Sequence, residues 1–330
     1  MMLQRFLSIL AILLTTTTVG FAQSQSNGVP VSNTIDATQL LLDLKTLSAD
    51  DMEGRLVGTP GGIKAREYVI RRFKESGLKP LGESYSQPFE FSYRGKPNEK
   101  IHGANVVGYI KGEQTPDKYI IVTAHYDHLG VKNGVVYNGA DDNASGTAAL
   151  FSLAQYFAKH PPAHSFIFVA TDAEEGSGAG GVKFVKEPPV DKKALVLNVN
   201  VDAICRDKND ILYAVGTRDY PFLKSYLEPV ASQSAIKLLF GHDDPSKDKG
   251  EDYWPPLQDG ISFHRAGIPY IYFGVEDYEL MHKPTDDYDN ITPLFYVHAV
   301  ETIDAALKQF DAHLPEIEQQ WANLRAKQVQ

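Results

Sequence analysis

Three nearly continuous runs of apolar residues constrain the fold of this chain more than any other feature. They lie at residues 119–124, 166–170 and 195–201, and only Asn198 and Asn200 interrupt the last one. A strand that is apolar on both faces needs cover on both faces, so these runs predict a buried, mainly parallel sheet between helices. Residues 145–159 have apolar side chains at helical spacing and predict the helix that connects the first two strands.

The same alternation of strands and helices continues along the chain. Further strands are expected at 211–215 and 269–273, and helices at 62–76, 220–232 and 294–310. Residues 88–93 alternate apolar and polar side chains and, with 105–110, predict an antiparallel pair at the sheet edge. Together these elements predict an α/β fold, a three-layer α/β/α sandwich with a mixed, mainly parallel central sheet.

The first 22 residues have the pattern of a signal peptide. Arg5 precedes a short apolar run, and small residues follow at a suitable cleavage point. We therefore expect removal of residues 1–22, export of the protein to the periplasm or the medium, and no membrane span in the mature chain. Residues 23–330 are then expected to form a single domain, with a loop or small insertion around 241–257.

Composition argues against nucleic acid and membrane partners and against a disulfide within the chain. The chain has 42 acidic and 32 basic residues, and its formal net charge of −10 disfavours nucleic acid and anionic membrane surfaces. Cys205 is the only cysteine, so no disulfide can form within the chain, and we expect a packed thiol there. Core burial and bound metal are then left to supply the stability.

Two histidines and five carboxylates stand at separate points of the chain, most of them directly after a predicted buried strand. His125 and Asp127 follow the strand at 119–124, Glu174 and Glu175 follow that at 166–170, Asp202 follows that at 195–201, and Asp142 and His282 lie in loops. Because ligands gather at the carboxyl ends of parallel strands, we expect these side chains to share one cleft. Imidazole and carboxylate ligands suit zinc, and a shared carboxylate suits two zinc ions.

Local spacing predicts different roles for two of these residues. His125 and Asp127 are two apart in an extended segment and point to the same side, so Asp127 is expected to orient the imidazole without binding metal. Glu174 and Glu175 are adjacent and cannot easily face the same way. One of the pair is therefore expected to bind metal, and the other is free to act as a general base.

At these residues the chain resembles the zinc-dependent aminopeptidases of peptidase family M28, which include secreted bacterial leucyl aminopeptidases. The resemblance covers most of the mature chain and lies in DMEGR at 51–55, GTPGG at 58–62, HYDHLG at 125–130, residues 139–146 and 172–176, Asp202, and HKPTD at 282–286. It implies a zinc-exopeptidase fold of the phosphorylase/hydrolase type, two zinc ions, and peptide substrates with a free N-terminus.

The resemblance also assigns the ligands. It implies that His125, Asp142 and Asp202 hold one zinc, that Asp142, Glu175 and His282 hold the other, and that Glu174 is the general base acting on a zinc-bridging water. A cis peptide bond after Asp142 is expected as well.

Some residues depart from the family or lie outside its motifs. Many relatives have Ser-Asp-His where this chain has Gln258, Asp259 and Gly260, so the contacts of the substrate pocket cannot be carried over. The charged segment at 241–254 either lines the pocket or is an ordinary solvated loop. His128, His242 and His264 are expected to be structural or surface histidines.

Three other functions compete with the aminopeptidase interpretation. The run Gly176–Gly181 fits a G-x-G-x-x-G dinucleotide fingerprint and predicts an NAD-dependent oxidoreductase, although the acids just before it would repel a pyrophosphate. A glutaminyl cyclase-like acyltransferase of the same fold would use one zinc. A non-catalytic binding protein on this scaffold would tend to lose ligands or the base, whereas Glu174 is present.

Overall fold

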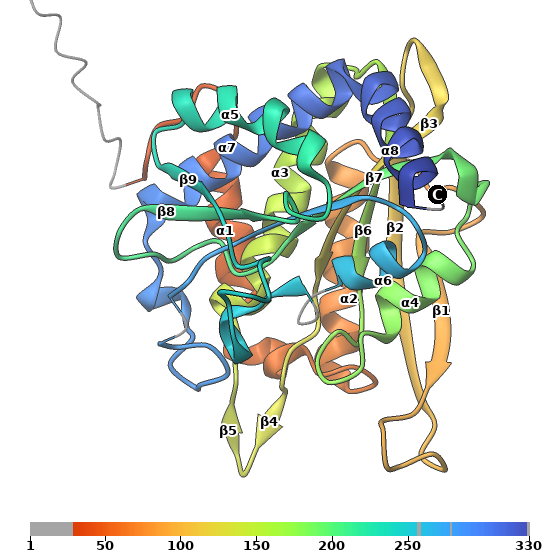
Figure 1. The fold of residues 1–330 in the computed structure, drawn as a ribbon. Helices are drawn as coiled ribbons and strands as arrows, with labels where there is room; N and C mark the ends of the chain where they lie inside the picture. The colour runs from red at the N-terminus through yellow and green to blue at the C-terminus, as the bar shows by residue number, and fades with distance from the viewer. Residues whose placement is uncertain (1–28, 256–258, 278, 329–330) are drawn as a thin grey trace, which may run out of the picture.

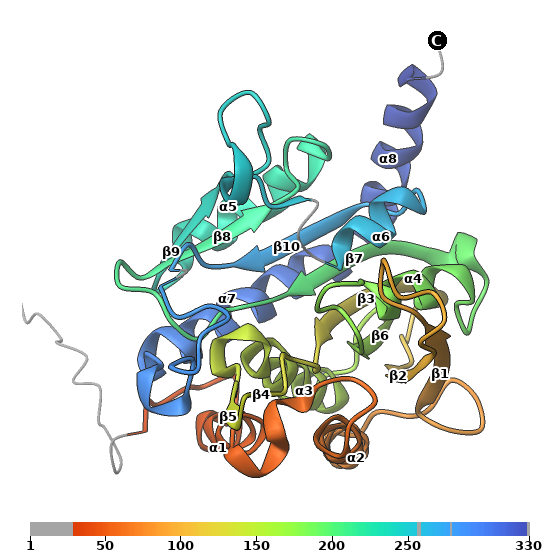
Figure 2. The same cartoon turned by 90° about the horizontal axis from the view of Figure 1, so that it is seen from below.

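The structure, a computed structural model, describes residues 29–255, 259–277 and 279–328, so the expected signal peptide and Gln258 lie outside it. One large mixed sheet lies between helices (Figures 1 and 2). Its eight strands follow the spatial order β1 (Ser86–Phe91), β2 (Ile101–Ile110), β6 (His164–Thr171), β3 (Thr115–His125), β7 (Leu195–Val201), β10 (Tyr270–Gly274), β8 (Ile211–Val215) and β9 (Lys237–Phe240). The predicted α/β architecture is confirmed.

The centre of the sheet is parallel. β3 pairs in parallel with both β6 and β7, and β10 pairs in parallel with β7. The antiparallel pair that the alternating pattern predicts is β1 and β2, with β1 at the edge and β2 between β1 and β6. Because β6, β3, β7 and β10 run the same way, their carboxyl ends meet at one edge.

Helices cover both faces of this sheet, as Figure 2 shows. One face is covered by α1 (Ala37–Leu47), α2 (Pro60–Glu75), α3 (Gly146–Lys159) and α7 (Pro293–Ala312), and the other by α4 (Ala179–Lys186) and α6 (Gly260–Arg265). Of the two remaining helices, α5 (Lys224–Gln233) packs on α7 and β9, and α8 (Leu314–Gln328) follows α7.

Side chains of the central strands alternate between two cores, as both-face burial requires. In β3, Ile120 and Val122 pack into the core under α3, and Ile121 packs into the core under α4 and α6. The polar residues that interrupt β7 hydrogen-bond inside the sheet: Thr123 Oγ1 donates to Asn200 Oδ1 at 2.7 Å, and Asn198 Nδ2 donates to Thr123 Oγ1 at 3.0 Å. The sheet therefore tolerates both asparagines because they bond to a neighbouring strand.

Most predicted elements are confirmed within a few residues. Thr59 caps α2 by accepting the N–H of Gly62 at 3.3 Å, and Pro60 occupies its first turn. The expected strand at 88–93 ends earlier, at Phe91, and the helix expected at 220–232 is a short 3₁₀ turn, Pro221–Leu223, that leads into α5.

The structure also contains elements that were not predicted: α1, α8, β9 and a small hairpin of β4 (Val131–Lys132) and β5 (Val135–Val136). The sequence of α1 does have the features of a helix: Asp36 caps it by accepting the N–H of Gln39 at 3.0 Å, and Leu40, Leu44 and Leu47 have helical spacing. Strands of two to four residues have too few side chains to show a period. No helix in the described ranges has the length and apolarity that a bilayer crossing requires.

Candidate metal centre

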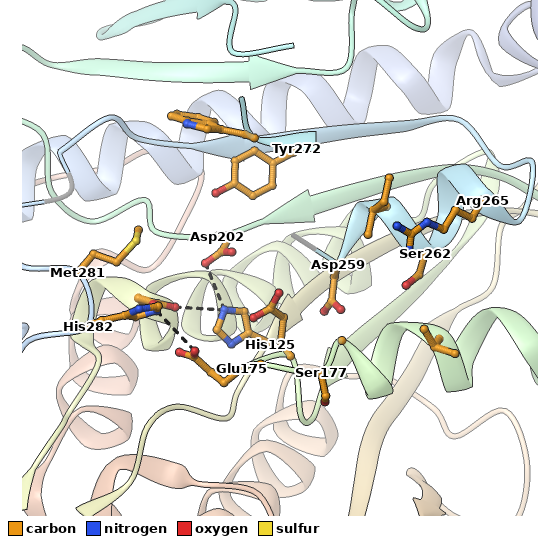
Figure 3. A pocket seen from close by; sticks show the side chains of 17 residues that line it. His125, Glu175, Ser177, Asp202, Asp259, Ser262, Arg265, Tyr272, Met281 and His282 are labelled. Carbon is orange, nitrogen blue, oxygen red and sulfur yellow. Dashed lines mark ion pairs between the residues drawn. The ribbon is translucent and has the colours of Figure 1, made fainter. Parts of the chain in front are cut away.

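A cleft of about 660 Å³ opens at the carboxyl edge of the parallel strands, and the predicted ligands line it (Figure 3). β3 ends at His125 itself, β6 ends three residues before Glu174, and β7 ends one residue before Asp202. Asp142 lies in the turn before α3, and His282 comes from the loop after β10. The fold thus brings together side chains from five separate segments.

The first ligand set is buried around His125. Its Nε2 lies 3.2 Å from Asp142 Oδ1 and 3.3 Å from Asp202 Oδ1, and the ligand atoms of the three residues all lie within 4.8 Å of one another. The other ring nitrogen, Nδ1, lies 3.1 Å from the backbone carbonyl of Asp127. A proton on Nδ1 donates to that carbonyl and leaves the Nε2 lone pair directed at the two carboxylates.

The second set gathers on the other oxygen of Asp142. His282 Nε2 lies 3.0 Å from Asp142 Oδ2 and 3.5 Å from Glu175 Oε2, with 54% of the His282 side chain exposed. His128 reaches the same carboxylates from the interior, and its Nδ1 lies 2.8 Å from Glu175 Oε1. His128 is fully buried beside these carboxylates, so of the two alternatives expected for it, structural or surface, the surface position does not hold.

Asp142 stands between the two sets. Although burial acts to raise its pKa, hydrogen bonds from His125 and His282 hold that pKa well below the ordinary value. Its backbone is fixed from the next loop, because Asp286 accepts the N–H groups of Asp141 and Asp142 at 2.8 and 3.1 Å. The peptide bond between Asp142 and Asn143 is cis, as the family resemblance implies. One oxygen of Asp142 is thereby presented to each histidine set.

Asp127 has partners besides His125, the neighbour it is expected to orient. Its carboxylate oxygens accept the backbone N–H groups of Glu174 at 3.0 Å and Glu175 at 3.2 Å, whereas the nearer oxygen lies 3.7 Å from His125 Nδ1. The closest partner of that nitrogen is the backbone carbonyl of Asp127, not its side chain. Asp127 therefore positions the Glu174–Glu175 turn, and it contacts His125 mainly through its main chain.

Arg55, from the motif at 51–55, supports the loops beneath the ligands. It is fully buried and donates to the carbonyl oxygens of Tyr126, Leu47, Asn138 and Gly139. Burial lowers the pKa of Arg55 to about 10, and Asp286, Asp142 and other acids of the cluster oppose that shift. Sequence reasoning did not assign it a role, although a charged residue inside a quoted motif was an available signal.

Glu174 and Asp259 face the same cleft without belonging to either ligand set. Burial is the largest cause that raises the pKa of Glu174, to which Asp259, Asp202 and Glu175 add, while His125 opposes them. Asp259 accepts a hydrogen bond from Thr171, its Oδ1 has no hydrogen-bond partner in the described part of the chain, and burial raises its pKa to about 6. Asp259 was noticed in the sequence only as part of a departure from the family.

The glycine-rich run after Glu175 serves packing. A Cβ at Gly180 would lie 2.2 Å from the carbonyl oxygen of Asp172, and one at Gly181 would lie 2.7 Å from Asp259 Oδ1. These glycines let α4 approach the end of β6 and α6 closely. The dinucleotide fingerprint at Gly176–Gly181 therefore has a structural explanation beside the acidic cleft.

Two groups of side chains form the walls of the cleft. Tyr272 and Met281 lie on one side, and Ser262 and Arg265 lie on the other (Figure 3). Trp254 and Ile261 also line the cleft. The segment at 241–254 thus contributes Trp254 to the pocket, and His242 stacks on that indole with ring centres 3.9 Å apart. His264 and Cys205 lie away from the cleft, His264 against Tyr220 and Cys205 in the core.

The arrangement fits divalent metal ions. Imidazoles and carboxylates approach one another to 3.0–3.5 Å in both sets, which is the spacing of ligands that share an ion. Asp202 and Asp142 are buried, and burial is the main cause that raises the pKa of Asp202. Buried carboxylates at this density need compensating positive charge, which zinc would supply.

Solved structures share the fold of this chain. The zinc aminopeptidase BSAP of Bacillus subtilis is 16% identical, with a TM-score of 0.65 over 84% of this chain and 95% of that one. A glutaminyl cyclase of Fimbriiglobus ruber is 20% identical, with a TM-score of 0.67 over 87% and 99%. At these identities the two structures show a shared fold.

A curated relative gives a closer sequence match. A probable zinc metalloprotease of Pyrenophora teres f. teres is 25% identical over 66% of this chain and 50% of its own length. The chain spans about half or less of the length of the curated relatives that it matches first. The sequence model of peptidase family M28 matches residues 105–307, which is more than half of the chain. The chain therefore belongs to peptidase family M28.

Proposed function

We propose that the protein is a secreted two-zinc aminopeptidase that hydrolyses the N-terminal bond of peptides. One observation carries the proposal: two imidazole–carboxylate sets share Asp142, and Glu174 stands beside them in the same cleft without belonging to either set. The shared carboxylate favours two metal ions over one, and the separate carboxylate favours a hydrolase over a binding protein.

The proposed ligands are those of the two sets. His125, Asp142 and Asp202 would hold one zinc ion, and Asp142, Glu175 and His282 the other. When bound, the zinc ions would lower the pKa of a water and polarise the peptide carbonyl. The negative charge of the ligands and the burial of all but His282 support this assignment.

Glu174 is proposed as the general base. Its carboxylate accepts the proton of the attacking water and then delivers it to the nitrogen of the leaving amine. A raised pKa suits a carboxylate that must hold a proton between these two steps, and burial raises the pKa of Glu174. Asp127 fixes its backbone by accepting its N–H at 3.0 Å, so the base is held beside the metal ligands.

The remaining proposals concern substrate, domains and location. A cleft with the acids Glu174 and Asp259 would favour the ammonium group of a peptide with a free N-terminus. We propose that residues 23–330 form a single peptidase domain, in which the loop expected at 241–257 lines the pocket through Trp254; residues 256–257 lie outside the described ranges. The signal-peptide pattern at 1–22 supports export to the periplasm or the medium.

A glutaminyl cyclase-like acyltransferase is the second candidate, because solved glutaminyl cyclases share the fold. That function is expected to need one zinc. The presence of both ligand sets favours the peptidase, and metal analysis separates the two: about two zinc ions per chain supports the peptidase. One zinc, with conversion of N-terminal glutamine to a cyclic product, would support the cyclase.

Activity on a panel of aminoacyl and N-blocked peptides tests the proposal. Peptides with a free N-terminus are expected to be cleaved, blocked ones to resist, and a chelator to stop the reaction until zinc is restored. E174Q should lower kcat by about 10²–10⁴-fold, the usual contribution of a general base, with zinc still bound. Equal cleavage of blocked peptides, or an E174Q variant with nearly full activity, would contradict the assignment.

A further inference from the structure

His128 lies within the second ligand set but has no role in the proposed function. Its side chain is fully buried, and Nδ1 lies 2.8 Å from Glu175 Oε1 and 3.9 Å from Asp142 Oδ2. His282 approaches the same two carboxylates with 54% of its side chain exposed. The two imidazole rings are 6.0 Å apart between centres. A buried and an exposed imidazole therefore face one pair of carboxylates.

The contact between His128 and Glu175 leaves buried polar atoms unsatisfied. Nδ1 and Oε1 are 2.8 Å apart, yet they are not aligned as a hydrogen bond, and neither atom has another hydrogen-bond partner in the described ranges. The Nε2 of His128 is also buried without one there. A buried polar atom without a partner destabilises the folded state. A cation bound by Nδ1 and by the carboxylate would satisfy both atoms at once.

Packing holds the His128 ring in this position. A Cβ at Gly139 would lie 2.5 Å from His128 Cδ2 and 2.6 Å from its Cγ, so the backbone of Gly139 lies directly against the ring. The ligand atoms of His128, Asp142 and Glu175 all lie within 4.8 Å of one another. The ring is thus presented to the carboxylates as a preorganised nitrogen donor.

We infer that His128 is a ligand, through Nδ1, of the metal held by Asp142, Glu175 and His282. The inference rests on the proposed metallopeptidase function and adds a residue that the family resemblance does not assign. It gives this metal four protein ligands, while the His125 set has three.

Proton NMR of the protein loaded with two cobalt(II) ions tests the inference. Each coordinated imidazole carries an exchangeable N–H, and the paramagnetic ion shifts its signal far outside the normal range. The wild type is expected to show three such signals, from His125, His128 and His282. H128Q and H128F are each expected to show two, and their affinity for one cobalt equivalent should fall at least about tenfold in a chelator competition.

H160Q is the matched control, because His160 is an exposed histidine at the end of α3. It should keep all three signals and the wild-type affinity. Two signals in the wild type, both retained in H128Q, would overturn the inference. If H128F does not fold, H128Q and the wild-type count still decide.

The two proposals can fail separately. A wild type that binds a single cobalt ion would contradict the two-metal function. The comparison with H128Q would then still decide on His128: a lost signal supports ligation, and an unchanged count overturns it.

Discussion

Replacing Asp127 with asparagine is the sharpest test of how this site is held together. The wild-type carboxylate accepts one backbone N–H on each oxygen, from Glu174 at 3.0 Å and from Glu175 at 3.2 Å, and it is fully buried. In D127N the side chain keeps one oxygen, while its new NH₂ group faces an N–H donor. The substitution therefore leaves the volume almost unchanged and removes one acceptor.

The expected magnitude follows from these two bonds. A hydrogen bond to a charged group contributes about 1.5–3 kcal/mol, and a neutral one about 0.5–1.5 kcal/mol. D127N loses one charged bond, weakens the other and creates a donor–donor contact, so unfolding free energy should fall by about 2–4 kcal/mol. Since the turn carries both the base and a ligand, kcat/KM should fall about 10²-fold and zinc affinity about 10–100-fold.

Asp311 offers a matched control at the other end of β6. Its two oxygens accept the N–H groups of His164 and Ala163, each at 2.8 Å, and His164 Nδ1 lies 3.1 Å from one of them. D311N should lose similar stability in urea unfolding but keep its kcat/KM and zinc affinity. If D127N loses stability as D311N does and keeps full activity, the Asp127 carboxylate does not position the base.

Three further perturbations have definite expected outcomes. R55L leaves the carbonyls of Tyr126, Leu47, Asn138 and Gly139 without their buried donor, so urea unfolding should show a loss of at least about 3 kcal/mol; an unchanged midpoint would contradict this. Burial raises the pKa of Asp259 from 3.8 to about 6, so between these pH values the folded state keeps a proton that the unfolded state releases. The contribution of Asp259 to the free energy of unfolding is therefore full below pH 4 and is lost as the pH rises through 6. The stability of the metal-free wild type relative to D259N should therefore fall over that range, and a flat difference would refute the assignment. G139A places a Cβ 2.1 Å from the carbonyl oxygen of Asp142 at a φ of 55°, and calorimetry should show a lower melting temperature and a lower zinc affinity. The control G134A has open space around the new Cβ and a φ of 77°, so it should lose stability and keep its zinc affinity.

Much of the fold could be predicted because buried strands appear in the sequence as runs of apolar residues. The strands at 119–124, 166–170 and 195–201 are apolar on both faces, and the structure covers both faces with helices. Short elements without such an apolar run were not predicted, such as the four-residue β9 and the two-residue strands of the hairpin. Strands this short have too few side chains to show a period, whereas α1 has a capping residue and helical spacing and could have been predicted.

The candidate site shows a similar division. Strand ends and family motifs together indicated all seven proposed residues. Six of them line one cleft in the structure, and Asp127 is buried and bonded to the backbone of the Glu174–Glu175 turn. Their roles stay predictions until the variants are measured. His128, Arg55 and Asp259 were not assigned roles, because the motifs and the departure in which they stand do not show what their side chains contact. Among their partners are Glu175, Tyr126 and Thr171, each more than 40 residues away in the chain.

The sequence by itself determined the layered α/β architecture, the edge of the sheet where ligands gather, and the chemical class of those ligands. These follow from patterns of neighbouring residues. Only the tertiary structure decided that Asp127 bonds to the Glu174–Glu175 turn, that His128 lies buried against Glu175, and that Arg55 supports the loops below. Such partners are chosen by packing between distant segments, where distances of a few ångströms decide which donor meets which acceptor.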